Sequence, residues 1–170
     1  MRYLIYAGVG VAALAAIVVA VGAMLPKEHV ATRSALFKQP ADKIFAIISG
    51  PPDWRPDVKS FEALPPRDGH PCWREVDKHG DGVTFERLEA DPPRRMVTRI
   101  ADKNLPYGGS WIHELREAPG GTLLRVSEHG EVYNPIFRFM SRFVFGYTAS
   151  LENYLKALGE KLGETAQIEE

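Results

Sequence analysis

Residues 134–163 read NPIFRFMSRFVFGYTASLENYLKALGEKLG, and this stretch decides how the rest of the chain folds. Its apolar side chains recur with the 3.6-residue period of an amphipathic helix. Asn134 is a favourable N-cap, and Pro135 suits the first helical position. Gly146 falls inside the periodic stretch and permits a bend or a close backbone approach. We therefore predict one long C-terminal helix whose apolar face needs a partner.

The preceding part of the chain alternates β-prone runs with proline- and glycine-rich turns, a pattern typical of an antiparallel sheet. A short helix that begins after Pro40 and ends at Gly50 interrupts the strands. The predicted strands cover residues 29–39, 58–64, 72–78, 83–90, 96–102, 110–118 and 122–132. Only the C-terminal helix is large enough to cover such a sheet. The predicted fold class is α+β, with a curved antiparallel sheet of about seven strands packed on a long C-terminal helix.

The N-terminus carries 23 consecutive uncharged residues, from Tyr3 to Leu25. A helix that crosses the hydrocarbon core of a bilayer needs about 20 apolar residues. We predict a transmembrane anchor over residues 1–26, one globular domain over 27–165 and a flexible tail over 166–170. A cleavable signal peptide is the alternative, because residues 21–23 fit the small-residue rule for cleavage. One such segment predicts a single-pass protein, and the Lys and Arg around the anchor slightly favour a cytoplasmic domain while leaving the orientation open.

Small residues recur every fourth position in the apolar segment, at Gly8, Ala12, Ala16 and Ala20. Such a stripe permits weak self-association of helices in lipid, although Ala and Gly are common in these segments in any case. The chain has 21 Lys and Arg against 22 Asp and Glu, with the two signs interspersed. This pattern argues against a nucleic-acid partner.

Motifs with a strong chemical meaning are not found in the sequence. There is no nucleophile elbow, phosphate-binding loop or paired-cysteine metal signature, and Cys72 is the only cysteine. We therefore expect neither a metal nor a cofactor.

Four stretches of the domain carry a family resemblance. They are PADKIF at 40–45, Trp54 soon after it, LPYGGSW at 105–111, and EHGEVYNP at 128–135 at the entry to the last helix. Together with the element order, they resemble the START/Bet v 1-like superfamily, also called SRPBCC or polyketide cyclase-like proteins, over residues 30–162. The resemblance implies a helix-grip fold whose cavity holds lipids, sterols, polyketides or hormones. It also implies that some members are cyclases or dehydratases and that others modulate proteins.

Residues 110–118 alternate so that Trp111, His113 and Leu115 share one face, which we expect to point inward. His113 in an apolar cavity would suit a general base or a ligand-orienting donor, and Glu128 is a second acid/base candidate. A histidine with a purely structural hydrogen bond is the alternative. Arg99 is a candidate partner for a buried Glu128, where the pair could hold a ligand's polar head; the alternatives are a structural salt bridge or two solvated side chains.

The sequence does not decide the placement of two further sets of side chains. The faces of Glu86 and Arg87 are uncertain, and Asp57 is expected to be a solvated loop group. Aromatic side chains can line an apolar pocket or form an ordinary core. The candidates for ligand binding are Trp54, Trp73, Trp111, Phe139, Phe143 and Tyr147.

These patterns favour a membrane-tethered domain that binds a hydrophobic, lipid-like small molecule between the sheet and the last helix. The first alternative is a cyclase or dehydratase that uses His113. The second is a non-catalytic protein-interaction module with a vestigial cavity. The volume of the cavity discriminates between a container and a scaffold.

Overall fold

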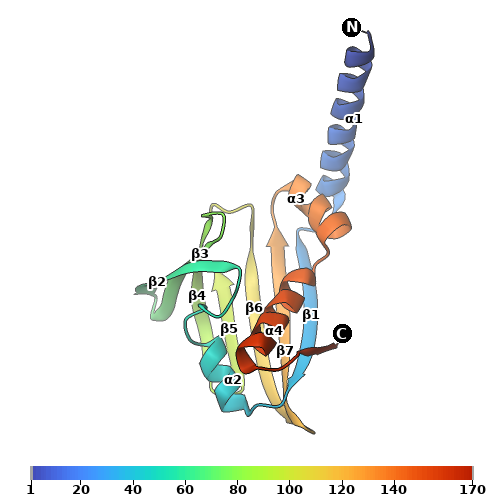
Figure 1. Cartoon of the computed structure of the whole chain (residues 1–170). Coiled ribbons are helices and arrows are strands. Elements are labelled where there is room, and N and C mark those ends of the chain that lie inside the picture. Colours follow the sequence, from blue (N-terminus) through green and yellow to red (C-terminus); the bar gives the residue numbers. More distant parts are fainter. Residues whose placement is uncertain (1, 170) are drawn as a thin grey trace.

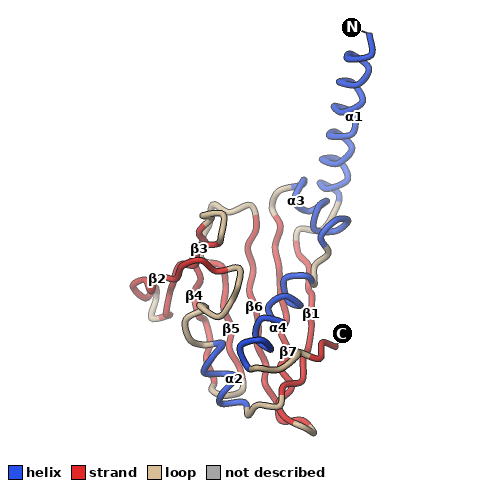
Figure 2. Tube along the Cα trace, viewed as in Figure 1, coloured by secondary structure: helices blue, strands red, loops and turns tan. Residues whose placement is uncertain are grey.

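The computed structural model describes residues 2–169 and shows an eight-stranded antiparallel sheet that curves around a helix (Figure 1, Figure 2). The strand order is β2-β3-β4-β5-β6-β7-β1-β8. The strands are β1 (Glu28–Phe37), β2 (Val58–Arg67), β3 (His70–Asp77), β4 (Gly82–Asp91), β5 (Arg95–Ile100), β6 (Tyr107–Ala118), β7 (Gly121–Val132) and β8 (Gln167–Glu169). The helices are α1 (Arg2–Met24), α2 (Ala41–Ile48), α3 (Pro135–Met140), the π-helical segment η1 (Ser141–Phe145) and α4 (Ala149–Leu162). The predicted α+β helix-grip arrangement is confirmed.

The core lies where α4 crosses the inner face of the sheet (Figure 1). Leu151, Leu155 and Leu158 on α4 are fully buried, as the helical period requires of one face. Leu124 and Val126 on β7 are also fully buried and belong to the same cluster. This packing positions α4 above the sheet and leaves the other half of the sheet free to border a cavity.

The predicted continuous C-terminal helix is wrong at Gly146. This residue has φ +74° and ψ 163°, a conformation that glycine alone adopts readily, and the helix resumes only at Ala149. The 3.6-residue period runs through the break because both halves are amphipathic. They face different partners: α4 packs on the sheet, whereas α3 packs against the end of α1.

The C-terminal residues also differ from expectation. Residues 167–169 form β8 on the edge of β1 and pair with Ser34–Leu36, where the sequence predicted a flexible tail. Ile168 packs partly buried against the core, which explains why this short strand is held in place.

The N-terminal helix α1 extends away from the domain (Figure 1). It is long and apolar enough to cross a membrane, a property that signal sequences share. Its C-terminal end packs closely on the domain. The backbones of Gly22 and Pro135 are so near each other that a Cβ on Gly22 would overlap the carbonyl oxygen of Pro135. Arg138 is buried on α3, and its Nη1 donates to the carbonyl oxygens of Leu25 at 2.8 Å and Ala23 at 3.4 Å. These bonds satisfy carbonyl groups at a helix end that lack partners within the helix.

Candidate functional site

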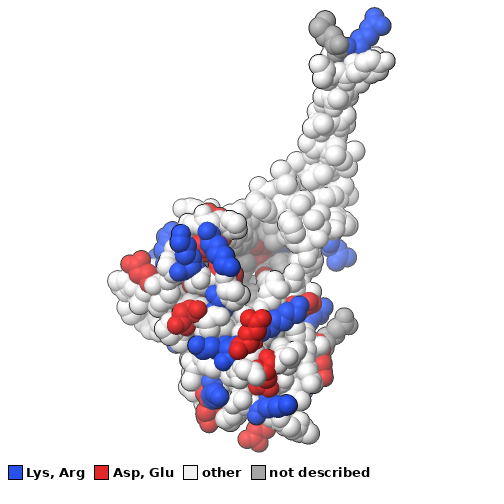
Figure 3. All heavy atoms as spheres, viewed as in Figure 1, with Lys and Arg blue, Asp and Glu red and all other residues white. Residues whose placement is uncertain are grey.

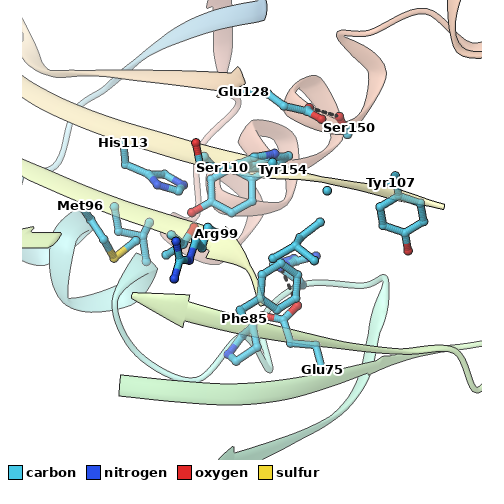
Figure 4. A pocket seen from close by; sticks show the side chains of 18 of the residues that line it. Glu75, Phe85, Met96, Arg99, Tyr107, Ser110, His113, Glu128, Ser150 and Tyr154 are labelled. Carbon is cyan, nitrogen blue, oxygen red and sulfur yellow. Dashed lines mark hydrogen bonds and ion pairs between the residues drawn. The ribbon is translucent and has the colours of Figure 1, made fainter. Parts of the chain in front are cut away.

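A cavity of about 520 Å³ lies between the inner face of the sheet and α4. Its lining is largely apolar, and Figure 4 shows side chains from several strands and from α4 converging on it. Figure 3 shows a hollow in the surface below the base of α1. The apolar and aromatic side chains that line the cavity include Ile48, Trp54, Phe61, Trp73, Phe85, Met96, Ile100, Trp111, Phe137 and Tyr147. The volume falls within the range of roughly 300–1,000 Å³ that is typical of small-molecule sites.

Strand alternation directs the predicted β6 side chains into this cavity. Trp111 and His113 line it, and they stand opposite Thr98 and Met96 on β5. Trp111 also stands opposite Glu128 on β7, so these side chains share the inner face of the sheet. The sequence-based face assignment of β6 agrees with the structure, while the roles of these residues stay predictions.

His113 is a buried, uncharged group in the cavity wall. It is 3% exposed, and its ring lies 5.4 Å from that of Tyr154 and 6.2 Å from that of Trp111. Burial lowers the pKa of His113 to about 4; the backbone of Met96 opposes this shift, and the charge of Arg55 adds to it. Both ring nitrogens are buried, and their approach to the backbone of Met96 falls short of hydrogen-bond geometry among the described residues. His113 is therefore neutral at pH 7 and has hydrogen-bonding capacity to spare.

A charged cluster that sequence reasoning missed closes the β3 side of the cavity. Arg55 Nη1 donates to Glu75 Oε2 at 2.9 Å, and Trp73 Nε1 donates to Glu75 Oε1 at 2.8 Å. Arg55 also pairs with Asp57, to which its Nε donates at 3.3 Å. Burial alone would lower the pKa of Arg55, but the hydrogen bond to Asp57 and the charge of Glu75 outweigh it, and the pKa is raised.

One sequence signal pointed to this cluster. Trp73 and Glu75 are two residues apart on a strand, so they share a face, and Trp73 was already a pocket candidate. Arg55 gave no such signal, because it lies in an irregular loop among prolines. Asp57, expected to be solvated, is largely exposed, although it pairs with Arg55.

Glu128 belongs to a second polar group, between β7, β1 and α4. Ser150 Oγ donates to Glu128 Oε2 at 3.3 Å, as Figure 4 shows, and His29 Nε2 lies 3.7 Å from Glu128 Oε1. The His29 ring stacks on Tyr147 with 4.0 Å between centroids. Burial raises the pKa of Glu128 and lowers that of His29, so both groups are displaced toward their neutral forms.

The candidate pair between Arg99 and Glu128 is not formed. Arg99 borders the cavity, but its Nε donates to Glu86 Oε2 at 2.9 Å, and the two residues stand opposite each other on β5 and β4. The same register settles which faces of β4 Glu86 and Arg87 occupy. Glu86 is buried beside Arg99, and Arg87 lines the cavity. The guanidinium of Arg87 lies 5.6 Å from the centre of the Trp73 ring.

The aromatic candidates divide at Gly146. Trp54, Trp73, Trp111 and Tyr147 line the cavity. Phe139 and Phe143 do not; their rings pack against each other at 4.9 Å, and Phe143 is 58% exposed. The break at Gly146 accounts for Phe143, because the stretch just before the break is exposed, although Phe137 at the start of α3 still reaches the cavity.

Comparisons with known proteins bear on the fold. A scan against protein-family models found no match, and neither did a search of curated proteins. Norcoclaurine synthase from Thalictrum flavum is structurally similar, with a TM-score of 0.61 and 14% identity over 81% of this chain and 87% of that one. A START superfamily protein from Mycobacterium smegmatis has a TM-score of 0.59 and 20% identity over 79% of this chain and 97% of that one.

A third similar structure is the di-domain ARO/CYC BexL from the BE-7585A biosynthetic pathway, with a TM-score of 0.60 and 19% identity. The match covers 86% of this chain but 53% of BexL, so this chain spans about half the length of that protein. Structural similarity at sequence identities this low establishes the fold, whereas the function has to be argued from the site. The chain has the helix-grip fold of the START/Bet v 1-like proteins.

Proposed function

We propose that this protein is a membrane-tethered domain that binds a hydrophobic, lipid-like small molecule in the cavity between the sheet and α4. The observation that carries the proposal is the cavity of about 520 Å³ lined by Trp54, Trp73 and Trp111. A protein-interaction module with a vestigial cavity would not need a space of this size. Apolar surface left facing water is unfavourable by about 25 cal/mol per Å², which an apolar guest would recover on entering.

The polar groups around Tyr154 indicate what the guest carries besides apolar surface. Trp54 and His113 both approach Tyr154, with ring centroids 5.3 and 5.4 Å away. The Trp54 Nε1–H and both His113 nitrogens are buried without a partner among the described residues. A buried donor without an acceptor costs about 1–3 kcal/mol. A guest with an uncharged oxygen, such as a hydroxyl or carbonyl, would satisfy this end of the cavity.

The tether in this proposal is α1, retained as a single-pass anchor. Its last turn is built into the domain through Gly22 against Pro135 and through Arg138 on the carbonyls of Ala23 and Leu25. Cleavage after Ala23 would remove the helix that these contacts hold. Anchoring keeps the cavity near a reservoir of apolar molecules and raises their effective concentration.

A cyclase or dehydratase is the second candidate function, because His113 and Glu128 are two titratable groups in one cavity. General acid–base catalysis is most efficient when the pKa of the group lies near the working pH. His113, whose pKa is about 4, is a weak base at neutral pH, so the site favours binding over proton abstraction. Unchanged turnover in His113→Leu and Glu128→Gln variants would remove this candidate; loss of turnover in both would favour it.

The proposal is tested by native mass spectrometry and lipid extraction of the full chain purified from membranes. Thr98 lines the cavity, and its neighbour Val97 stands on the opposite face of the same strand. Thr98→Phe fills the cavity and should abolish co-purification of a guest, while Val97→Phe is the matched control and should retain it. Equal amounts of lipid in wild type and Thr98→Phe would contradict the proposal.

A further inference from the structure

An exposed apolar patch lies beside the base of α1. It consists of five side chains from α3 and η1, which are 48% to 63% exposed: Ile136, Phe137, Phe143, Val144 and Phe145. We name these five residues the α3–η1 patch. Soluble proteins rarely leave so many large apolar side chains exposed in one short stretch unless the surface meets a partner or a membrane.

The patch is fixed relative to α1. Arg138 is buried within α3, between the exposed residues, and bonds to the carbonyls of Ala23 and Leu25 at the end of α1. Gly22 allows α1 to approach Pro135 at the start of α3 so closely that no side chain would fit. α1 has 23 residues, which is about 35 Å of helix and enough to cross a hydrocarbon core of about 30 Å. With α1 across a bilayer, α3 lies at the membrane surface.

The charge distribution supports lipid as the occupant of this surface. In Figure 3 the uncharged surface of α1 continues onto the adjoining part of the domain, and the charged side chains in this view lie to either side of it, including a group of Lys and Arg at the upper left, and farther down. Arg142 is the one basic residue of η1 and is exposed, which suits contact with lipid phosphates while the neighbouring Phe143, Val144 and Phe145 enter the interface. Because α1 would hold the patch next to the bilayer, a protein partner would have to fit between the patch and the lipid surface.

We propose that the α3–η1 patch inserts into the bilayer interface and holds the cavity mouth against the lipid surface, so that a guest passes between lipid and cavity without crossing bulk water. The inference rests on the proposed retention of α1 as an anchor. Phe137 connects the two features, because it belongs to the patch and also lines the cavity. Tyr107, Val132 and Tyr147 line the cavity on the same side of the domain as α3.

The depth of the patch is measured directly in the full chain. A nitroxide at Val144→Cys is compared with one at Lys161→Cys, which is exposed on the last turn of α4, at the end of the domain away from α1. The single native cysteine, Cys72, is buried and serves as the unlabelled background. In phosphatidylcholine vesicles, the label at 144 should be reached by oxygen and shielded from a water-soluble nickel complex, with the reverse at 161. Equal access of the nickel complex to both sites would overturn the inference.

A transfer experiment separates this inference from the proposed function. The triple variant F143S/V144S/F145S removes apolar area outside the cavity wall, and F143L/V144L/F145L is the matched control that keeps it. Brominated stearate supplied in phosphatidylcholine vesicles should quench the cavity tryptophans about tenfold more slowly in the serine variant, with the same final amplitude, because interfacial binding scales with buried apolar area. The leucine variant should keep the wild-type rate.

The outcomes of that experiment are distinguishable. An unchanged rate in the serine variant would overturn membrane insertion and leave the cavity function standing. No saturable quenching in any variant, wild type included, would overturn the cavity function, while the nitroxide measurement would still decide whether the patch enters lipid.

Discussion

Arg55 Nη1 donates to Glu75 Oε2 across 2.9 Å, and this contact joins the proline-rich loop after α2 to strand β3. The two side chains are 23% and 10% exposed, so the pair is largely withdrawn from water. Trp73 donates to the other oxygen of Glu75 and leaves that carboxylate with two fixed partners. The pair thereby fixes a charged wall on one side of an otherwise apolar cavity.

Removing one member of this pair should destabilise the protein far more than removing an exposed one. Arg55→Met leaves Glu75 buried without a cation, and we expect a loss of about 3 kcal/mol in the free energy of unfolding. The measurement is urea unfolding of the full chain in detergent micelles, followed by tryptophan fluorescence.

The control uses Arg95, which donates to Glu114 at 2.7 Å on the surface. Arg95→Met should change the unfolding free energy by less than about 1 kcal/mol, since exposed pairs contribute little. Adding Glu75→Gln to Arg55→Met should restore part of the loss. If Arg55→Met lowers the free energy of unfolding no more than Arg95→Met does, the buried pair does not stabilise the fold.

His113 predicts a specific pH dependence of stability. Its folded-state pKa of about 4 lies below the ordinary value of 6.5, so the unfolded chain binds the proton more tightly. Above pH 6.5 the His113 ring is neutral in both states and does not lower the free energy of unfolding. As the pH falls from 6.5 toward 4, the free energy of unfolding decreases by about 3 kcal/mol in all, because the unfolded chain takes up the proton first. Thermal unfolding of wild type and His113→Leu across this range should show that the variant lacks this part of the acid destabilisation. Parallel curves for the two proteins would mean that His113 titrates normally.

Arg138 should control how firmly α1 is held to the domain. Arg138→Ala removes the donor to the carbonyls of Ala23 and Leu25, so amide hydrogen exchange should accelerate in residues 22–27 and in α3. Arg142→Ala, an exposed arginine of the adjacent segment, is the matched control and should leave that exchange unchanged. Identical exchange in both variants would argue that Arg138 does not hold the junction.

Gly146 is expected to tolerate no side chain without cost. A Cβ there would meet nothing within 4 Å, so any penalty comes from the backbone conformation alone. We expect Gly146→Ala to lose about 2 kcal/mol of unfolding free energy, the usual cost of holding a non-glycine residue in such a region. A stabilised Gly146→Ala would instead indicate the uninterrupted helix that the sequence period predicts.

The fold was accessible from sequence because its signals are local. Alternation in β6 placed Trp111 and His113 on the inner face, and the helical period placed Leu151 and Leu155 against the sheet. Periodicity cannot show which partner each half of an amphipathic stretch meets. For this reason the sequence leaves Phe143 as a candidate for either the cavity wall or the core, whereas it lies exposed just before the break at Gly146.

The polar contacts of the site were harder to predict from the sequence, because ion pairs depend on the register between strands. Arg99 meets Glu86 instead of Glu128 because β5 pairs with β4 at that level, and β4 carries a register shift between Arg87 and Glu89 that the sequence does not reveal. Arg55 reaches Glu75 from an irregular loop, for which no periodic rule specifies direction. The inward side chains of β6 and α4 were therefore placed correctly, while contacts between elements required the structure.

The occupancy of the cavity is tested most directly by quenching of intrinsic fluorescence. All three tryptophans of the chain, Trp54, Trp73 and Trp111, line the cavity, so a brominated stearate bound there lies close to each of them. We expect saturable quenching in the full chain, retained in Val97→Phe and lost in Thr98→Phe. Quenching that never saturates, or that is identical in Thr98→Phe and wild type, would mean that no apolar guest binds between the sheet and α4.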